Sequence, residues 1–215
     1  MNPPPQGKRS LAGPSRATYR QSIGDRSGLF ATLAAAWAPA KALYPGCYLD
    51  ISPSTAIPSV TYVDTDRRAA RYFASHEFAV AELRDRTRPG VEPDVNFLHA
   101  DYTTALGLAQ AHFDLLISLY AGPLWDHRQR YLKPRGLFLA NTSHGDASLA
   151  ALAPPRLELV AAVHHRGEHY RFDTDALDSY LTPKTPTAAD PDAIRRKGRG
   201  IAYTRTAFAY LFRLA

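Results

Sequence analysis

The sequence has few features of a disulfide-bonded, membrane-spanning or exported protein. It holds one cysteine, Cys47, among 215 residues, so no disulfide forms within the chain, as is usual for proteins of a reducing compartment. No uninterrupted apolar run reaches the roughly 18 residues of a membrane-spanning helix. The first residues are basic and proline-rich and lack the apolar segment of a signal peptide. We therefore expect a cytoplasmic protein without a membrane span.

The sequence also lacks the short motifs of several common chemistries. It contains no G-x-G-x-x-G loop, no P-loop and no G-x-S-x-G elbow. No cysteines and histidines have the spacing of a zinc site, and the adjacent His164 and His165 would point to opposite sides of a strand. The sequence therefore predicts no metal site and no serine-hydrolase nucleophile.

Composition and charge limit the domain organisation and the partners. A length of 215 residues with 45% hydrophobic content predicts a single globular domain over residues 17–215, after a flexible basic and proline-rich tail over residues 1–16. The net charge is +6, and part of the excess lies in residues 195–199, RRKGR. Such a cluster can bind phosphate-rich partners, but it has no interleaved aromatic residues. We interpret it as a solvated loop and predict no specific nucleic-acid partner.

Apolar segments and turn signals alternate along the chain in a way that predicts an α/β fold. Residues 113–120, FDLLISLY, are too continuously apolar for a half-exposed strand and are expected in the middle of a covered sheet. Strands are expected at residues 42–46, 60–64, 95–99, 113–120, 137–141, 157–165, 169–173 and 201–214. Helices are expected at residues 19–36, 103–111, 125–132 and 174–181, and one broken helix or two short ones at 67–73 and 79–86, with a long loop at 182–200. The order predicts a single-domain, Rossmann-like, doubly wound sheet that is mostly parallel and ends in antiparallel strands.

The most informative stretch covers residues 42–66, in which ALYPGCYLD leads through a polar loop to VTYVDTD. Gly46 and Asp64 are 18 residues apart, close to the roughly 20-residue spacing of glycine turn and acid in nucleotide-binding α/β units. The turn lets the backbone approach a ligand closely, and the acid can accept hydrogen bonds from ribose hydroxyls. A buried strand pair with an ordinary polar turn remains the alternative.

The order of these features resembles the class I S-adenosylmethionine-dependent methyltransferase family. Asp101 and Tyr102 follow the third strand, an apolar fourth strand comes next, and the turn YLKPRG resembles the Leu-Lys-Pro-Gly-Gly turn of that family, with Arg135 in place of the first glycine. The resemblance implies a seven-stranded sheet with a C-terminal antiparallel hairpin. The first motif is divergent, because GCYLD replaces a turn with several glycines.

The resemblance also implies S-adenosylmethionine as cofactor and a set of residues that bind it. In chain order these are Tyr44, Pro45, Gly46, Cys47 and Asp50 around the methionine part, Asp64 at the ribose hydroxyls with Asp66 close behind, Asp101 and Tyr102 at the adenine, and Ser118 and Leu119 where cofactor and substrate meet.

Three residues are candidates for a catalytic role. Methyl transfer mainly requires alignment of the reactants, and a base helps only when the acceptor has a proton to lose. The segment NTSHGD follows the fifth strand, so His144 is a candidate base with Asp146 orienting it, although the same residues suit a simple turn. Tyr120, with Trp125 nearby, could stack on a planar or cationic group or only pack.

We expect an S-adenosylmethionine-dependent transferase that methylates a small molecule. Its fourth strand ends in SLYAG and lacks the Asn/Asp-Pro-Pro-aromatic motif of enzymes that methylate amino groups of nucleic acids. One alternative is another reaction of the same cofactor, aminocarboxypropyl transfer or cyclisation. Another is a non-catalytic nucleotide- or RNA-binding module. The sequence identifies neither the acceptor nor the oligomeric state.

Overall fold

A computed structural model describes residues 16–75, 79, 82–84, 86–87, 93–152 and 157–215. The tail predicted for residues 1–16 lies outside the described residues except for Arg16, and so does part of the helix predicted at 79–86. Within the described part of the chain, no helix has the length and apolar character needed to cross a membrane.

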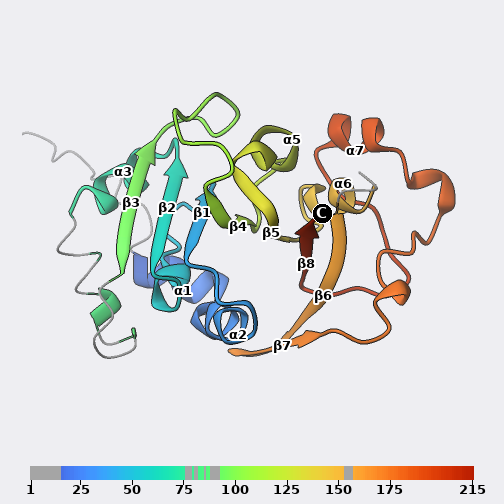
Figure 1. Ribbon diagram of the computed structural model, residues 1–215, viewed down its shortest axis with the longest axis horizontal. Helices are drawn as coiled ribbons and strands as arrows, with labels where there is room; N and C mark the ends of the chain where they lie inside the picture. The colour runs from blue at the N-terminus through green and yellow to red at the C-terminus, as the bar shows by residue number, and fades with distance from the viewer. Residues whose placement is uncertain (1–15, 76–78, 80–81, 85, 88–92, 153–156) are drawn as a thin grey trace, which may run out of the picture.

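The described strands form one eight-stranded sheet in the order β3-β2-β1-β4-β5-β8-β6-β7 (Figure 1). They are β1 (Lys41–Pro45), β2 (Ser59–Asp64), β3 (Asp94–His99), β4 (Phe113–Ser118), β5 (Leu132–Ala140), β6 (Leu157–Arg166), β7 (His169–Asp173) and β8 (Ala209–Leu214). Strands β1 to β5 are parallel to their neighbours in this set, whereas β8 runs antiparallel to both β5 and β6. The predicted α/β sheet with antiparallel C-terminal strands is confirmed.

The sheet has one strand more than the seven-stranded arrangement that the resemblance implied. The additional strand is β7, which pairs with β6 as an antiparallel hairpin at the edge of the sheet. The last strand, β8, lies between β5 and β6. The predicted long strand over residues 201–214 is shorter, because regular pairing begins only at Ala209.

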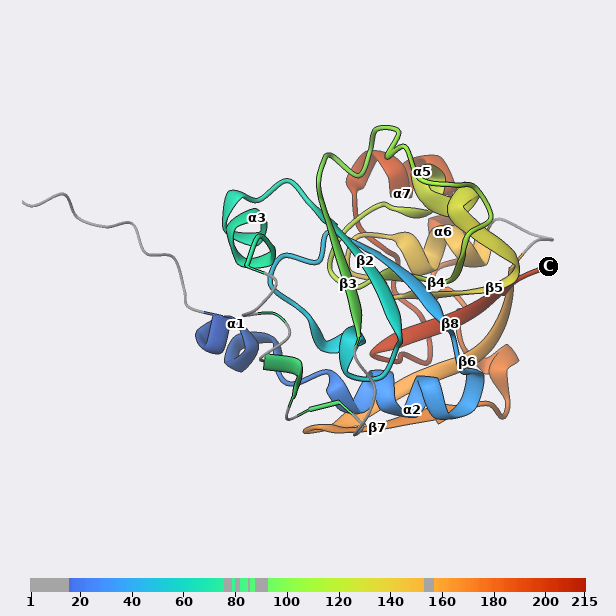
Figure 2. The same cartoon turned by 60° about the vertical axis from the view of Figure 1, so that its left-hand side comes forward.

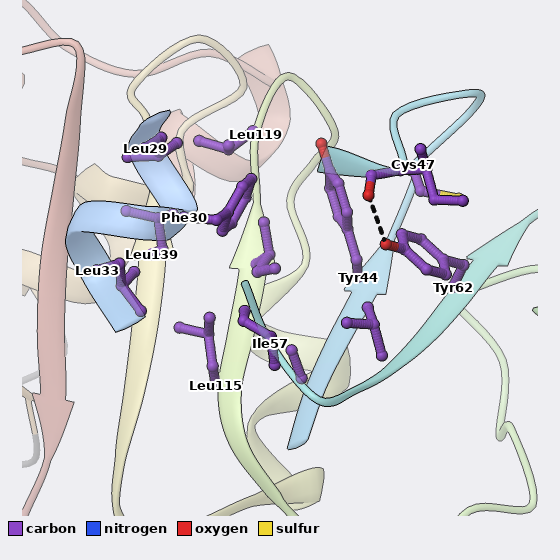
Figure 3. Packing of buried hydrophobic residues seen from close by; sticks show 14 of the residues in the cluster. Leu29, Phe30, Leu33, Tyr44, Cys47, Ile57, Tyr62, Leu115, Leu119 and Leu139 are labelled. Carbon is purple, nitrogen blue, oxygen red and sulfur yellow. Dashed lines mark hydrogen bonds between the residues drawn. The ribbon is translucent and has the colours of Figure 1, made fainter. Parts of the chain in front are cut away.

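Helices cover both faces of the sheet (Figure 2). They are α1 (Arg16–Ile23), α2 (Ser27–Trp37), α3 (Arg67–Phe73), α5 (Trp125–Arg128), α6 (Asp146–Leu152) and α7 (Pro191–Lys197). Side chains of α2 pack with Leu115 and Leu139 in one core (Figure 3), whereas Leu116 and Phe138 pack with α5 and α6 in a second core. Successive residues of a strand point to opposite faces, so the central strands are apolar on both sides, as the run FDLLISLY predicted.

The connection from β1 to β2 contains no α-helix. It holds only a short 3₁₀ helix, η1 (Ser52–Thr55), with Pro53 near its start. Parallel strands are usually joined by a crossover helix, so this first crossover is unusual in having only a single 3₁₀ turn. The residues of η1 are buried nevertheless. Because no α-helix follows β1 directly, the turn after β1 is stabilised by side-chain contacts.

Several predicted helices differ from the structure for local reasons. The helix expected at 19–36 is divided into α1 and α2 at Gly24, whose φ is +76°. Residues 103–111 form turns, because Asp101 accepts hydrogen bonds from the Thr103 N–H and hydroxyl at 2.7 Å each and so competes with helical hydrogen bonding. The loop predicted at 182–200 contains α7, and only a 3₁₀ helix, η3 (Leu177–Ser179), lies in the helix predicted at 174–181.

Candidate functional site

Four of the predicted site segments meet at the turn after β1. The Gly46 N–H donates to the Val63 carbonyl at 2.8 Å, which joins this turn to the end of β2. A Cβ atom on Gly46 would lie 2.4 Å from the Cβ of Ala121 and 3.6 Å from Cε1 of Tyr102. The ends of β1, β2, β3 and β4 therefore converge at the carboxyl edge of the sheet, where open α/β folds bind ligands.

This close approach makes Gly46 a position where alanine is expected to be destabilising. Gly46→Ala combines a φ of +67° with the contact to Ala121. Gly107→Ala is the matched control, because Gly107 has the same φ of +67° and nothing within 4 Å of its Cβ position. We expect Gly46→Ala to lower the free energy of unfolding by about 1–3 kcal/mol more than the control, the usual cost of overpacking. Urea unfolding measures the difference, and equal losses would show that the turn tolerates a Cβ.

Asp64 fixes the turn after β1. At the end of β2, its Oδ2 accepts the Tyr48 N–H at 2.7 Å and its Oδ1 accepts the Asp66 N–H at 2.8 Å. Tyr48 has a φ of +47°, a left-handed conformation that glycine adopts more easily, so this carboxylate stabilises a turn whose backbone conformation is unfavourable for tyrosine. A carboxylate has about four acceptor sites, and Asp64 is 9% exposed. About two of these acceptor sites are therefore not used by the hydrogen bonds to Tyr48 and Asp66.

The other predicted acids differ in how far their carboxylates are engaged in hydrogen bonds within the protein. Asp66 is the N-cap of α3 and accepts the Arg68 N–H at 2.6 Å. Asp101 is exposed, and the Thr103 N–H and hydroxyl both donate to its Oδ1. These hydrogen bonds lower the pKa of Asp101, so the carboxylate is ionised at neutral pH and is available as an acceptor. Tyr102 is half-buried beside the Gly46 turn.

Among the buried side chains that the resemblance implied, three have little hydrogen-bonding capacity. They are Pro45, Cys47 and Leu119. Burial, together with the charges of Asp64 and Asp50, raises the pKa of the Cys47 thiol well above its usual value, so this thiol is neutral and a poor nucleophile. These residues can present only backbone atoms to a ligand.

A buried ion pair lies beneath the turn and involves a residue that the sequence did not indicate. Arg26 Nη1 donates to Asp50 Oδ2 at 3.0 Å, with side chains 3% and 1% exposed. The Tyr44 hydroxyl donates to the same oxygen at 3.1 Å. Burial and the charge of Asp50 raise the pKa of Tyr44 well above its usual value and that of Tyr19 to about 12. The carboxylate of Asp50, at the end of the first motif, is therefore engaged in an ion pair within the protein.

The predicted pair of His144 and Asp146 is not formed. Asp146 is buried, and its carboxylate accepts the N–H groups of Leu124 and Trp125, at 2.7 and 3.0 Å, and the Ser118 hydroxyl. Burial raises the pKa of Asp146. His144 is exposed, and its Cβ would lie 2.4 Å from a Cβ on Gly122. Asp146 therefore holds the loop after β4 and is not positioned to orient His144, which corrects the prediction.

Tyr120 is an exposed aromatic side chain at the tip of β4. It is 52% exposed and has a φ of +62°, a conformation that is costly for a non-glycine residue and that is common at functional sites. The Arg26 guanidinium lies 5.1 Å from the centre of its ring, and the Tyr120 N–H donates to Asn141 Oδ1 at 3.5 Å. The Tyr120 ring thus lies at the edge of the sheet, in contact with the guanidinium of Arg26.

No protein-family model and no curated protein sequence matches the chain. A methyltransferase from Geobacter sulfurreducens is similar in structure, with 19% identity, 77% of this chain and 87% of that chain covered, and a TM-score of 0.49. The N-methyltransferase NodS from Bradyrhizobium japonicum, in complex with S-adenosylhomocysteine, has 14% identity, 78% and 91% coverage and a TM-score of 0.41.

A third similar structure, the YcgJ protein from Bacillus subtilis, has 20% identity, 59% coverage of this chain and a TM-score of 0.39. This match spans 56% of the YcgJ chain, about half its length. The similarity is one of fold. The assignment of sites rests on the residues described above.

Proposed function

We propose that this protein is an S-adenosylmethionine-dependent methyltransferase of the class I type. The observation that carries the proposal is the meeting of the Gly46 turn, Asp64 and Tyr102 at the carboxyl edge of a sheet ordered β3-β2-β1-β4-β5. The residues fit an adenosyl group, because Asp64 keeps free acceptor sites for ribose hydroxyls and Asp101 is an ionised acceptor placed after β3. The cofactor would supply an activated methyl group, so the protein has mainly to align the acceptor.

The proposed roles of the remaining residues follow from their exposure. Tyr120 stands at the tip of β4, where its ring can form a wall of the acceptor site. His144 is the exposed candidate base, whereas Asp146 is occupied by the loop that it holds. We propose a small-molecule acceptor, because in the segment 195–199 Arg195 pairs with Asp126 at 2.6 Å within the protein.

The test is binding of S-adenosylhomocysteine, and Asp64→Asn is expected to weaken it at least about tenfold. The substitution keeps the size of the side chain but removes the charge and replaces one of its two acceptor oxygens by an NH2 donor, and the hydrogen bonds of such a carboxylate are worth about 1.5–3 kcal/mol each. Asp94→Asn is the matched control, because Asp94 is an exposed acid at the opposite end of β3. Calorimetric titration measures affinity, and thermal unfolding establishes that each variant is folded. Unchanged affinity in folded Asp64→Asn would contradict the assignment.

Product analysis separates methyl transfer from the alternatives. The buried Asp50 at the end of the first motif would suit a shifted methionine tail, which favours aminocarboxypropyl transfer as the second candidate. Release of S-adenosylhomocysteine indicates methyl transfer, and release of methylthioadenosine indicates the second reaction. Absence of cofactor binding would leave the non-catalytic binding module.

A further inference from the structure

Arg128, at the end of α5, is a buried charge without a carboxylate partner among the described residues. Its side chain is 0% exposed. Nη2 donates to the Thr104 carbonyl, and the guanidinium lies 5.3 Å from the centre of the Tyr131 ring. Nε and Nη1 are buried and have no hydrogen-bond partner. Arg26, in contrast, is equally deep but is paired with Asp50.

Such an arrangement is unfavourable unless something else compensates the charge. Burial of an ionised group without a partner is costly, and burial lowers the pKa of Arg128. An arginine nevertheless stays protonated in proteins, because its ordinary pKa is so high. The chain therefore carries a fixed cation in its interior that is in no ion pair among the described residues, although the exposed Asp101 acts on it through space.

Arg128 borders a cavity of about 690 Å³, within the range of small-molecule sites. The other lining residues are Thr103, Asp126, His127, Gln129, Arg130 and Leu214. The one carboxylate in this lining, Asp126, is occupied, because its two oxygens accept Nε and Nη2 of Arg195 at 2.6 and 3.0 Å. The wall that remains carries Arg128, Arg130 and His127, so it favours an anion.

We propose that this cavity is a phosphate-binding site in which Arg128 supplies the buried charge and Arg130 the exposed one. A phosphate group has the charge and the several acceptor oxygens needed to reach two guanidinium groups. Nε and Nη1 of Arg128 are covered, so the side chains around them have to move aside and expose them as the anion enters, while the exposed Arg130 and His127 turn toward it. The site lies beside Thr103, whose hydroxyl donates to Asp101. The proposed cofactor carries no phosphate, so the phosphate would belong to a different ligand or to another group of the substrate.

The experiment is titration of the full, cofactor-free chain with inorganic phosphate, with sodium chloride added to hold ionic strength constant. Calorimetry and thermal unfolding are expected to show saturable binding by the unchanged protein. Arg128→Met is expected to bind at least about tenfold more weakly, because charge-assisted hydrogen bonds are lost. Arg71→Met, which removes an exposed arginine on α3, is the matched control and is expected to bind normally.

Arg128→Met is expected to fold, because it replaces an unpaired buried charge with an apolar side chain of similar length. Arg130→Met provides a second variant at an exposed position and is also expected to weaken binding. Dimethyl phosphate separates two sources of the group: binding of both anions supports a phosphodiester ligand, and binding of inorganic phosphate alone supports a phosphate monoester. No phosphate effect beyond that of chloride, or equal affinity in Arg128→Met, would overturn the proposal. The outcome is independent of the S-adenosylhomocysteine titration.

Discussion

Replacing Asp50 with alanine is expected to lower the free energy of unfolding by about 3–5 kcal/mol, the usual cost of removing one partner of a buried ion pair. The variant leaves the Arg26 guanidinium buried with its main anion gone, since Arg26 Nη1 lies 3.0 Å from Asp50 Oδ2. It also removes the acceptor of the Tyr44 hydroxyl and of the Ser52 N–H. Urea unfolding followed by circular dichroism measures the loss.

Two further variants make this prediction specific. Glu158→Ala breaks an exposed pair with Arg213 at 4.0 Å, and we expect a change of less than about 1 kcal/mol because exposed pairs contribute little. The double variant Arg26→Met with Asp50→Leu removes both charges and is expected to regain much of the stability lost in Asp50→Ala. If the double variant is as unstable as the single one, the loss comes from packing and not from the unpaired charge.

Asp146→Ala is the second substitution for which we expect a large loss, of about 3 kcal/mol or more. Its carboxylate accepts the Leu124 and Trp125 N–H groups and the Ser118 hydroxyl, and each buried donor left without a partner costs about 1–3 kcal/mol. The free energy of unfolding measures the total. Because Trp125 belongs to the affected loop, its fluorescence reports the local change.

The control for this prediction is Asp178→Ala, which removes an exposed acid and is expected to change stability by no more than about 0.5 kcal/mol. A folded Asp146→Ala with the stability of the control would mean that the carboxylate is not needed by the loop. It would then be free for the role beside His144 that the sequence suggested.

The strands were predictable from the sequence because their signal is local. FDLLISLY and VTYVD are apolar runs bounded by turns, and each of them contains a strand that has a neighbour on both sides in the sheet, β4 and β2. Helix α7 could also have been predicted from the sequence, although the segment was assigned to a loop. Asp190 caps its start, Pro191 is its first residue, and Gly198 follows its end with a φ of +59°, which is the usual signature of helix ends. The proline and the basic residues around it were read as a loop.

The partners within the site were not predictable, because they depend on contacts between distant segments. Arg26 meets Asp50 across 24 positions of sequence, and nothing in either local pattern identifies the other. The proximity of His144 and Asp146 in sequence was misleading. Gly145 between them has a φ of +100°, and Asp146 begins a helix that turns its carboxylate into the protein. Spacing placed the acids at strand ends, but it did not show which of them face inward.

The position of β8 in the sheet has a consequence for the order of assembly. Strand β8 follows all the other described strands in sequence, yet in the sheet it lies between β5 and the β6–β7 hairpin and pairs with both β5 and β6. During synthesis, β1 to β5 can pair as soon as they leave the ribosome, while the hairpin has no sheet edge to join. The edge of β5 therefore stays unpaired until β8 emerges, and during that interval it is open to wrong pairing with other chains.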